Sequence, residues 1–207
     1  MKSIERERII RTVLGTNLKF KIKGSLAILS PPTEILRGLY LDNSATPGAF
    51  YPEVFVLPLF RPTQEIYFNF GFRLQDSNGF TQWNVRSSNL SHDLNNSIER
   101  FAFPFWESAK SAFDFATMPH EPGDLRNMNN REGIALAWAK AGNISRAIKE
   151  MDALLAAVDH RVVWENVIAD RIQSFKKLLV SNPTQAQKQL VEWELQTRKN
   201  LKLDGVV

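Results

Sequence analysis

The segment 65–74 constrains the fold of this chain more than any other feature of its sequence. Every second residue in it is apolar, and three of these five residues are phenylalanine: Ile66, Phe68, Phe70, Phe72 and Leu74. Because the side chains of a strand point to opposite faces with a period of two, this pattern predicts a half-buried β-strand with an aromatic inner face. Such a face must be covered by other elements of the same chain.

The composition changes near residue 90 and indicates what provides this cover. Alanine occurs three times before that point and fourteen times after it, whereas six of the ten prolines lie before it. Alanine favours helix, while proline and alternating aromatic residues favour strands joined by turns. The sequence therefore predicts a single α+β domain over residues 1–207. We expect residues 1–90 to be mainly β with an N-terminal helix, and residues 91–207 to be all-helical. The antiparallel sheet is expected to contain about five strands packed against the helical half.

The individual elements follow from local patterns. Strands are expected at 18–23, 26–29, 35–41, 54–60 and, after a turn at 76–79, around Phe80, Trp83 and Val85. The strand at 54–60 is apolar on both faces, which favours a central position in the sheet. Helices are expected at 90–101 (ending before Pro104), 131–141, 144–158, about 164–179, and from Asn182-Pro183 onward.

Composition also limits the class of protein. The chain contains no cysteine, which excludes a disulfide framework, thiolate metal sites and a cysteine nucleophile. No apolar stretch reaches the roughly 20 residues that cross a bilayer, and the first residues lack the apolar core of a signal peptide. We therefore expect a cytoplasmic protein that makes no contact with membrane.

The net charge of +4 comes from residues 1–90, where Lys19, Lys21 and Lys23 alternate with apolar residues, whereas residues 91–207 are balanced. This alternation places the three lysines on one exposed face of a strand, where they discourage edge-to-edge pairing. Nucleic-acid binders usually have denser basic patches with exposed aromatic residues between them. We therefore interpret the lysines as a solvated face and consider a nucleic-acid partner unlikely on this sequence.

No catalytic motif is found. The chain lacks the glycine-rich phosphate-binding loops and the Gly-x-Ser-x-Gly elbow. Ser91, His92 and Asp93 are adjacent in sequence and therefore cannot face one another as a catalytic triad requires; Ser91 or Asp93 is expected to cap a helix instead. We predict no catalytic residues and no cofactor, and we do not expect an enzyme.

The loop 117–130 contains the best candidates for metal ligands, namely His120, Glu121 and Asp124. One histidine with two carboxylates suits a divalent cation. No second histidine lies four residues further on, and Pro122 prevents a regular helix there, so a polar loop without a metal is the preferred interpretation. A cleft beside this loop is the basis of an alternative function, in which the protein binds a small molecule or is an atypical enzyme.

The outer face of the predicted aromatic strand is the best candidate binding surface. It contains Tyr67, Asn69 and Arg73 around Gly71, and Trp83 is expected beside them on the neighbouring strand. Tyr, Trp and Arg are enriched at binding hot spots, and a glycine lets another backbone approach closely. The alternative is that Gly71 serves packing and that Arg73 is a buried, paired charge. The leading function is a non-catalytic interaction module whose partner is another protein.

Two resemblances add to this interpretation. The segment 133–155, with Gly142 and Asn143 at its turn, resembles a single tetratricopeptide-type helical hairpin, but no second copy follows it. The segments 50–60 and 68–74, together with Trp83, look like an uncharacterised bacterial family of unknown function with an α+β N-terminal half and a helical C-terminal half. That resemblance implies a non-enzymatic binding protein, for example an immunity-type or regulatory partner.

Overall fold

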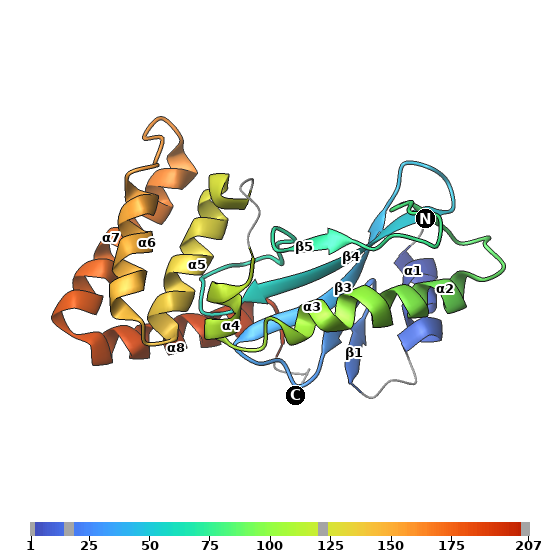
Figure 1. The fold of residues 1–207 in the computed structure, drawn as a ribbon, viewed down its shortest axis with the longest axis horizontal. Helices are drawn as coiled ribbons and strands as arrows, with labels where there is room; N and C mark the ends of the chain where they lie inside the picture. Colours follow the sequence, from blue (N-terminus) through green and yellow to red (C-terminus); the bar gives the residue numbers. More distant parts are fainter. Residues whose placement is uncertain (1–2, 15–18, 120–123, 204–207) are drawn as a thin grey trace.

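The N-terminal half of the chain forms a six-stranded antiparallel sheet, and the C-terminal half forms helices, which confirms the predicted α+β class (Figure 1). The computed structural model describes residues 3–14, 19–119 and 124–203. The strands are β1 (Phe20–Lys23), β2 (Leu26–Leu29), β3 (Ile35–Asn43), β4 (Ala49–Pro58), β5 (Gly71–Arg73) and β6 (Trp83–Asn84). Their order is β1-β2-β3-β4-β5, and β6 pairs with β4 on the side that β5 also occupies.

The hairpin of β3 and β4 is the centre of the sheet, with a register that runs from Ile35 opposite Pro58 to Asn43 opposite Phe50. Alternate residues of β4 enter different hydrophobic clusters: Val54 and Val56 join one, and Phe55 and Leu57 join the other. Both faces of β4 are therefore covered, as its continuous apolar sequence predicts.

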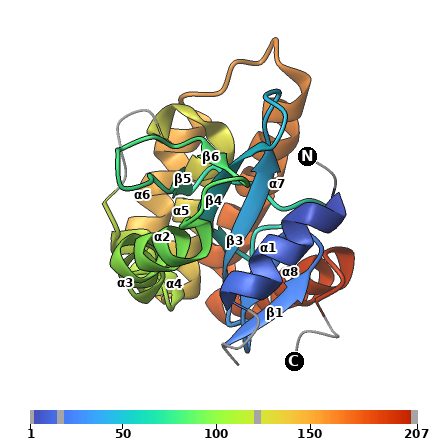
Figure 2. The same ribbon diagram turned by 90° about the vertical axis from the view of Figure 1, so that its right-hand side faces the viewer.

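Helices cover one face of the sheet and continue beyond it as a bundle. They are α1 (Ser3–Leu14), α2 (Leu90–Ser97), a π-helical segment (Ile98–Ala102), α3 (Phe103–Glu107), α4 (Ala112–Thr117), a 3-10 turn (Asp124–Arg126), α5 (Met128–Lys140), α6 (Ile144–Leu155), α7 (Val163–Ser181) and α8 (Pro183–Asn200). Figure 1 shows α5, α6 and α7 at one end of the molecule and α1 at the other, and Figure 2 shows α1 and β1 from that end. Within the described ranges, no helix combines the length and the apolar character needed to cross a membrane.

The helical half follows local signals closely. Asn182 caps α8 by accepting a hydrogen bond from the Gln185 N–H at 3.1 Å, and Pro183 occupies the first turn. Gly142 ends α5 with a φ of +80°, a left-handed conformation that residues with a side chain rarely adopt. The helical hairpin expected between residues 131 and 158 is therefore present, formed by α5 and α6.

Two predictions about the helix that begins near residue 90 are wrong. The helix continues through Pro104, because the wide π-helical segment comes directly before it, where a regular turn would clash with the proline ring. Its N-cap is Asn89, which makes no side-chain capping bond, so neither Ser91 nor Asp93 caps it.

The aromatic segment 65–74 differs most from its prediction. Only Gly71–Arg73 forms a strand, and the apolar residues are divided between the two sides of the sheet. Phe68 stacks on Tyr40 on one side, with ring centroids 4.9 Å apart, and Phe70 packs against Phe115 on the other. Phe72 remains 37% exposed. The apolar residues alternate in the sequence, but only Gly71–Arg73 pairs with β4, so residues 66–68 pack on the opposite face of the sheet from Phe70 and Leu74.

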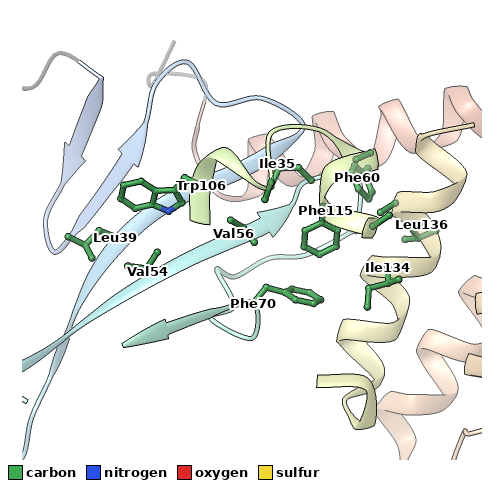
Figure 3. Packing of buried hydrophobic residues seen from close by; sticks show 14 of the residues in the cluster. Ile35, Leu39, Val54, Val56, Phe60, Phe70, Trp106, Phe115, Ile134 and Leu136 are labelled. Carbon is green, nitrogen blue, oxygen red and sulfur yellow. The ribbon is translucent and has the colours of Figure 1, made fainter. Parts of the chain in front are cut away.

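The main hydrophobic cluster lies between the sheet and the helices. Figure 3 shows Phe70 and Phe115 close to Ile134 of α5, with Val54 and Val56 of β4 nearby. The second cluster lies on the opposite face, where the 66–68 segment, Leu201 and Leu203 cover β4. The prediction that helices seal an apolar face of the sheet is therefore confirmed, although most of that face belongs to β3 and β4.

Candidate functional site

The predicted binding residues do not form one exposed patch. Trp83 is only 4% exposed, and its Nε1 donates a hydrogen bond to the Leu74 carbonyl at 2.9 Å, so its predicted place on an exposed face is wrong. Tyr67 is half-buried on the far side of the sheet, with the Arg61 guanidinium 5.0 Å from its ring centroid. Asn69, which lies in the chain between Tyr67 and β5, is also half-buried. Of the four residues, Arg73 alone lies in a strand that is exposed throughout.

Gly71 and Arg73 partly follow the alternative interpretation. A Cβ on Gly71 would lie 2.0 Å from the Val54 carbonyl oxygen, so this glycine allows β5 to approach β4 closely and serves packing. The Arg73 side chain is paired but not buried: it is 44% exposed, and its Nε lies 2.7 Å from Glu53. This hydrogen bond to Glu53 raises the pKa of Arg73 above its ordinary value.

The main chain of β5 forms an open edge of the sheet (Figure 1). The N–H groups of Val56 and Leu74 donate to the carbonyls of Phe70 and Pro52, at 2.9 and 2.8 Å. Since bonded residues alternate along an antiparallel pair, the main-chain groups of Gly71 and Arg73 point away from β4. In the part of the chain that the structure describes, no partner is found for these outward groups. We call this feature the β5 edge.

Two half-exposed aromatic side chains lie beside the β5 edge. Phe72 is opposite Val54 in the register, so it points to the helical face of the sheet, where its ring meets Phe105 edge-on at 5.2 Å. Phe101 lies four residues before Phe105 in the same helical segment and is 43% exposed. Exposed aromatic groups next to free main-chain donors and acceptors are typical of surfaces that bind polypeptides.

An open pocket of 290 Å³ continues this surface, between the chain that follows β5 and the helix that contains Phe101. Its lining residues are Gln75, Asp76, Ser77, Asp93, Asn96, Ser97, Arg100 and Phe101. The Ser97 hydroxyl donates to the Gln75 carbonyl at 2.9 Å, which joins the two walls. We call this hollow the β5 pocket.

The charged groups of the β5 pocket are not paired with one another. Asp76 Oδ1 accepts hydrogen bonds from the N–H groups of Asn78 and Phe80, both at 2.9 Å, which stabilises the turn after β5. The Arg100 guanidinium lies 5.1 Å from the Phe101 ring centroid. Among the described residues, neither the Asp93 carboxylate nor the Arg100 guanidinium has an ion-pair partner. These groups are therefore available to a bound molecule.

A second polar cluster, which the sequence did not indicate, lies at the junction of the sheet and the helical bundle. Glu132 of α5 is 0% exposed, and its two oxygens accept hydrogen bonds from Arg61 at 2.8 Å and from Arg171 of α7 at 2.6 Å. Arg61 also donates to Asn129. Because every charge in this cluster is paired, we interpret it as a structural link between β4 and the helices.

The structure describes the loop 117–130 except for residues 120–123, which include two of the three candidate metal ligands. His120 and Glu121 lie outside the described residues, and Asp124 is described only as the first residue of a 3-10 turn. In the described ranges, no group of three or more His, Cys, Asp or Glu side chains is placed to hold a metal ion. His92 contacts Asn96 at 3.0 Å, and His160, at the junction of α6 and α7, contacts Asn166 at 2.9 Å.

Comparison of the chain with models of known families, with characterised proteins and with solved structures gives no match. Sequence reasoning singled out Arg73 and Gly71 but missed Asp76, Asp93 and Arg100 as neighbours. The available sequence signal was the adjacent Arg100 and Phe101 at the end of the helix predicted over residues 90–101.

Proposed function

We propose that this protein is a non-catalytic interaction module that binds an extended segment of another polypeptide at the β5 edge. One observation supports this proposal above the others. β5 is an exposed edge strand whose outward main-chain groups, at Gly71 and Arg73, have no partner among the described residues. Exposed edges of this kind are used for recognition by strand addition, in which a peptide extends the sheet.

In this mode, the bound segment lies beside β5 and exchanges hydrogen bonds with the N–H and C=O groups of Gly71 and Arg73. Its side chains alternate between the two faces of the sheet. On the helical face they meet Phe72 and Phe105, and on the other face they meet Arg73. Main-chain bonds provide affinity in such complexes, and the side-chain contacts provide specificity.

The biological role belongs to the same proposal. The resemblance of the sequence implies that this protein is a cytoplasmic immunity-type or regulatory protein. Such a protein would act by binding another protein and would need no catalytic group. The identity of the protein bound at β5 tests this role directly.

The experiment uses a photo-crosslinking amino acid, p-benzoylphenylalanine, at position 72 of the full chain in the cells that produce it. The decisive variants are Arg73→Pro and Arg73→Ala. Both remove the ion pair with Glu53, but only the proline removes the outward N–H, which takes no part in the β4 ladder. The same crosslinker at Phe113, which is exposed on α4, is the positional control.

We expect one discrete adduct with another polypeptide from position 72. It should persist in Arg73→Ala and fall at least tenfold in Arg73→Pro, because a main-chain bond is lost and the proline ring blocks the edge. Adducts that form equally in both variants, or that form only from position 113, would refute binding at the β5 edge.

A further inference from the structure

We propose that the segment bound at the β5 edge is basic, and that one of its lysine or arginine side chains occupies the β5 pocket. This inference rests on the proposed function and specifies the chemistry of the partner. Its support comes from the charge around the edge, the shape and lining of the pocket, and the contrast with the opposite edge of the sheet.

The surface around the β5 edge is acidic, although the chain has a net charge of +4. Four carboxylates and two guanidinium groups border the edge and the pocket. The carboxylates are those of Asp42, Glu53, Asp76 and Asp93, and the guanidinium groups are those of Arg73 and Arg100. Arg73 is already shared by Glu53 at 2.7 Å and Asp42 at 3.8 Å, so it adds little attraction for an acidic partner. Charge complementarity therefore favours a cationic segment.

The pocket suits one cationic side chain. Its volume of 290 Å³ lies just below the range of pockets that bind whole small molecules, about 300 to 1,000 Å³, so a single long side chain is the better match. The Asp93 carboxylate is half-buried and has no partner among the described residues, so it is available to an ammonium or guanidinium group. The exposed Phe101 ring offers a face for the aliphatic stem or the cation itself.

Arg100 limits the β5 pocket to one cationic side chain. It forms no ion pair with Asp76 or Asp93 among the described residues, but its charge reduces the net charge of the pocket from two negative charges to one. One cationic side chain neutralises that charge, whereas a second would be unpaired. An acidic or neutral side chain would leave Asp93 partly desolvated without a counter-charge, which is unfavourable.

The opposite edge of the sheet excludes the same segment. β1 ends the sheet on the other side, and Lys21 and Lys23 are exposed there without an ion pair among the described residues. A basic segment is repelled by these lysines and attracted by the carboxylates around β5. Charge thus directs the segment to one of the two edges of the sheet.

The probe for this inference is a phage-displayed library of random dodecapeptides, selected on the full-length protein. Enriched peptides are synthesised with a fluorophore, and their dissociation constants are measured by anisotropy against five proteins: wild type, Arg73→Ala, Arg73→Pro, Asp93→Asn and Glu99→Gln. Glu99 is an exposed carboxylate of the same helical segment that does not line the pocket, so Glu99→Gln removes the same charge outside the site.

We expect enriched peptides with a recurrent Lys or Arg. Asp93→Asn should weaken them about tenfold or more, since a charge-assisted bond is lost, while Glu99→Gln changes affinity less than twofold. Replacing the basic residue of the peptide by Gln should cost about tenfold on the wild type and less than twofold on Asp93→Asn, because the two changes remove one shared interaction.

The failures of the two proposals are distinguishable. Peptides that depend on the Arg73 N–H but lack a basic residue, or that tolerate Asp93→Asn, would overturn the basic-segment inference and leave the proposed function standing. Peptides that bind Arg73→Pro as well as Arg73→Ala would overturn strand addition and this inference with it. A library that yields no enrichment would count against both.

Discussion

The sheet ends in a short strand on each side, β1 and β5, but the charges and aromatic side chains of these two edge strands differ. The β1 edge has exposed lysines at positions 21 and 23, with no ion pair found for them in the described ranges, and no exposed aromatic side chain within the strand. The β5 edge has a single charged residue, Arg73, whose charge is matched by Glu53 and Asp42, and a half-exposed Phe72.

This difference shows how one sheet can protect one edge and leave the other available. Unpaired lysines on an edge strand oppose pairing with another chain, because the added strand would bring their charges out of water. A neutralised arginine imposes no such barrier, and an aromatic ring beside it adds contact area. Four changes follow, from the largest expected effect to the smallest: the first tests the junction of the sheet and the helical bundle, and the other three break or sharpen the comparison of the two edges.

The largest effect should come from Glu132→Gln, which breaks the ion-pair cluster that joins Arg61, at the end of the central hairpin, to α5 and α7. The change keeps the shape of the side chain but leaves Arg61 and Arg171 buried or partly buried without their counter-charge. We expect the free energy of unfolding to fall by about 3–5 kcal/mol. Chemical denaturation followed by tryptophan fluorescence measures it.

Glu150→Gln is the matched control, since Glu150 pairs with Arg146 on an exposed helix face. It should cost no more than about 0.5 kcal/mol, as exposed i,i+4 pairs do. Equal losses in the two variants would contradict the structural role assigned to Glu132.

Next in size is a pair of glycine changes, one near each edge. Gly71→Ala places a methyl group against the Val54 carbonyl and should separate β5 from β4, at a cost of about 1–3 kcal/mol. Gly24→Ala, in the turn between β1 and β2, meets no atom within 4 Å but has a φ of +58°, so its cost is conformational and about 1 kcal/mol.

Hydrogen exchange of the amides in β4 and β5 separates the two cases. Gly71→Ala should expose the amides of Val54 and Val56, whereas Gly24→Ala should leave them protected. Loss of protection in both variants would show that the sheet opens as one unit. It would contradict the prediction that Gly71→Ala acts by a local steric clash and Gly24→Ala only by strain in its own turn.

Phe72→Lys gives β5 an exposed lysine, the feature that protects the β1 edge. The residue is 37% exposed and its register places only its backbone in the β4 ladder, so the fold should tolerate the change. Binding of the peptides selected on the wild type should weaken about tenfold, or about 1.4 kcal/mol, because a contact is lost and a cation is added beside a basic segment.

Phe113→Lys is the control for Phe72→Lys, because Phe113 is an exposed aromatic residue on α4 that packs on Trp138. It should change the affinity less than twofold when measured by the same anisotropy titration. Equal weakening by both variants would indicate a general charge effect and not a local one.

The smallest effect on stability, within about 0.5 kcal/mol, is expected from the double change Lys21→Thr and Lys23→Thr on the exposed side of β1. Its consequence should instead be weak self-association at high protein concentration, since the edge loses its protecting charges. Lys177→Gln with Lys188→Gln, on exposed helix positions, removes the same net charge and should remain monomer-like in sedimentation. Identical sedimentation of the two double variants would mean that the lysines do not protect the β1 edge.

Local sequence patterns determined much of this protein. The proline and asparagine at the start of α8, the glycine after α5 and the continuous apolar run of β4 act through neighbours in the chain or through simple alternation. Such signals are complete within a few residues, so the α+β class, the central strand and the helical half could be predicted from them.

Only the tertiary structure decided which side of the sheet each aromatic residue of 65–74 joins, that Trp83 is buried, and that Glu132 is neutralised by two distant arginines. The same holds for the β5 pocket, where residues 75–77 meet residues 93–101 because β5 pairs with β4 while α2 packs on the sheet's helical face. The physical reason is that these contacts depend on how already formed elements pack, and the free energy of packing is not encoded in any one segment.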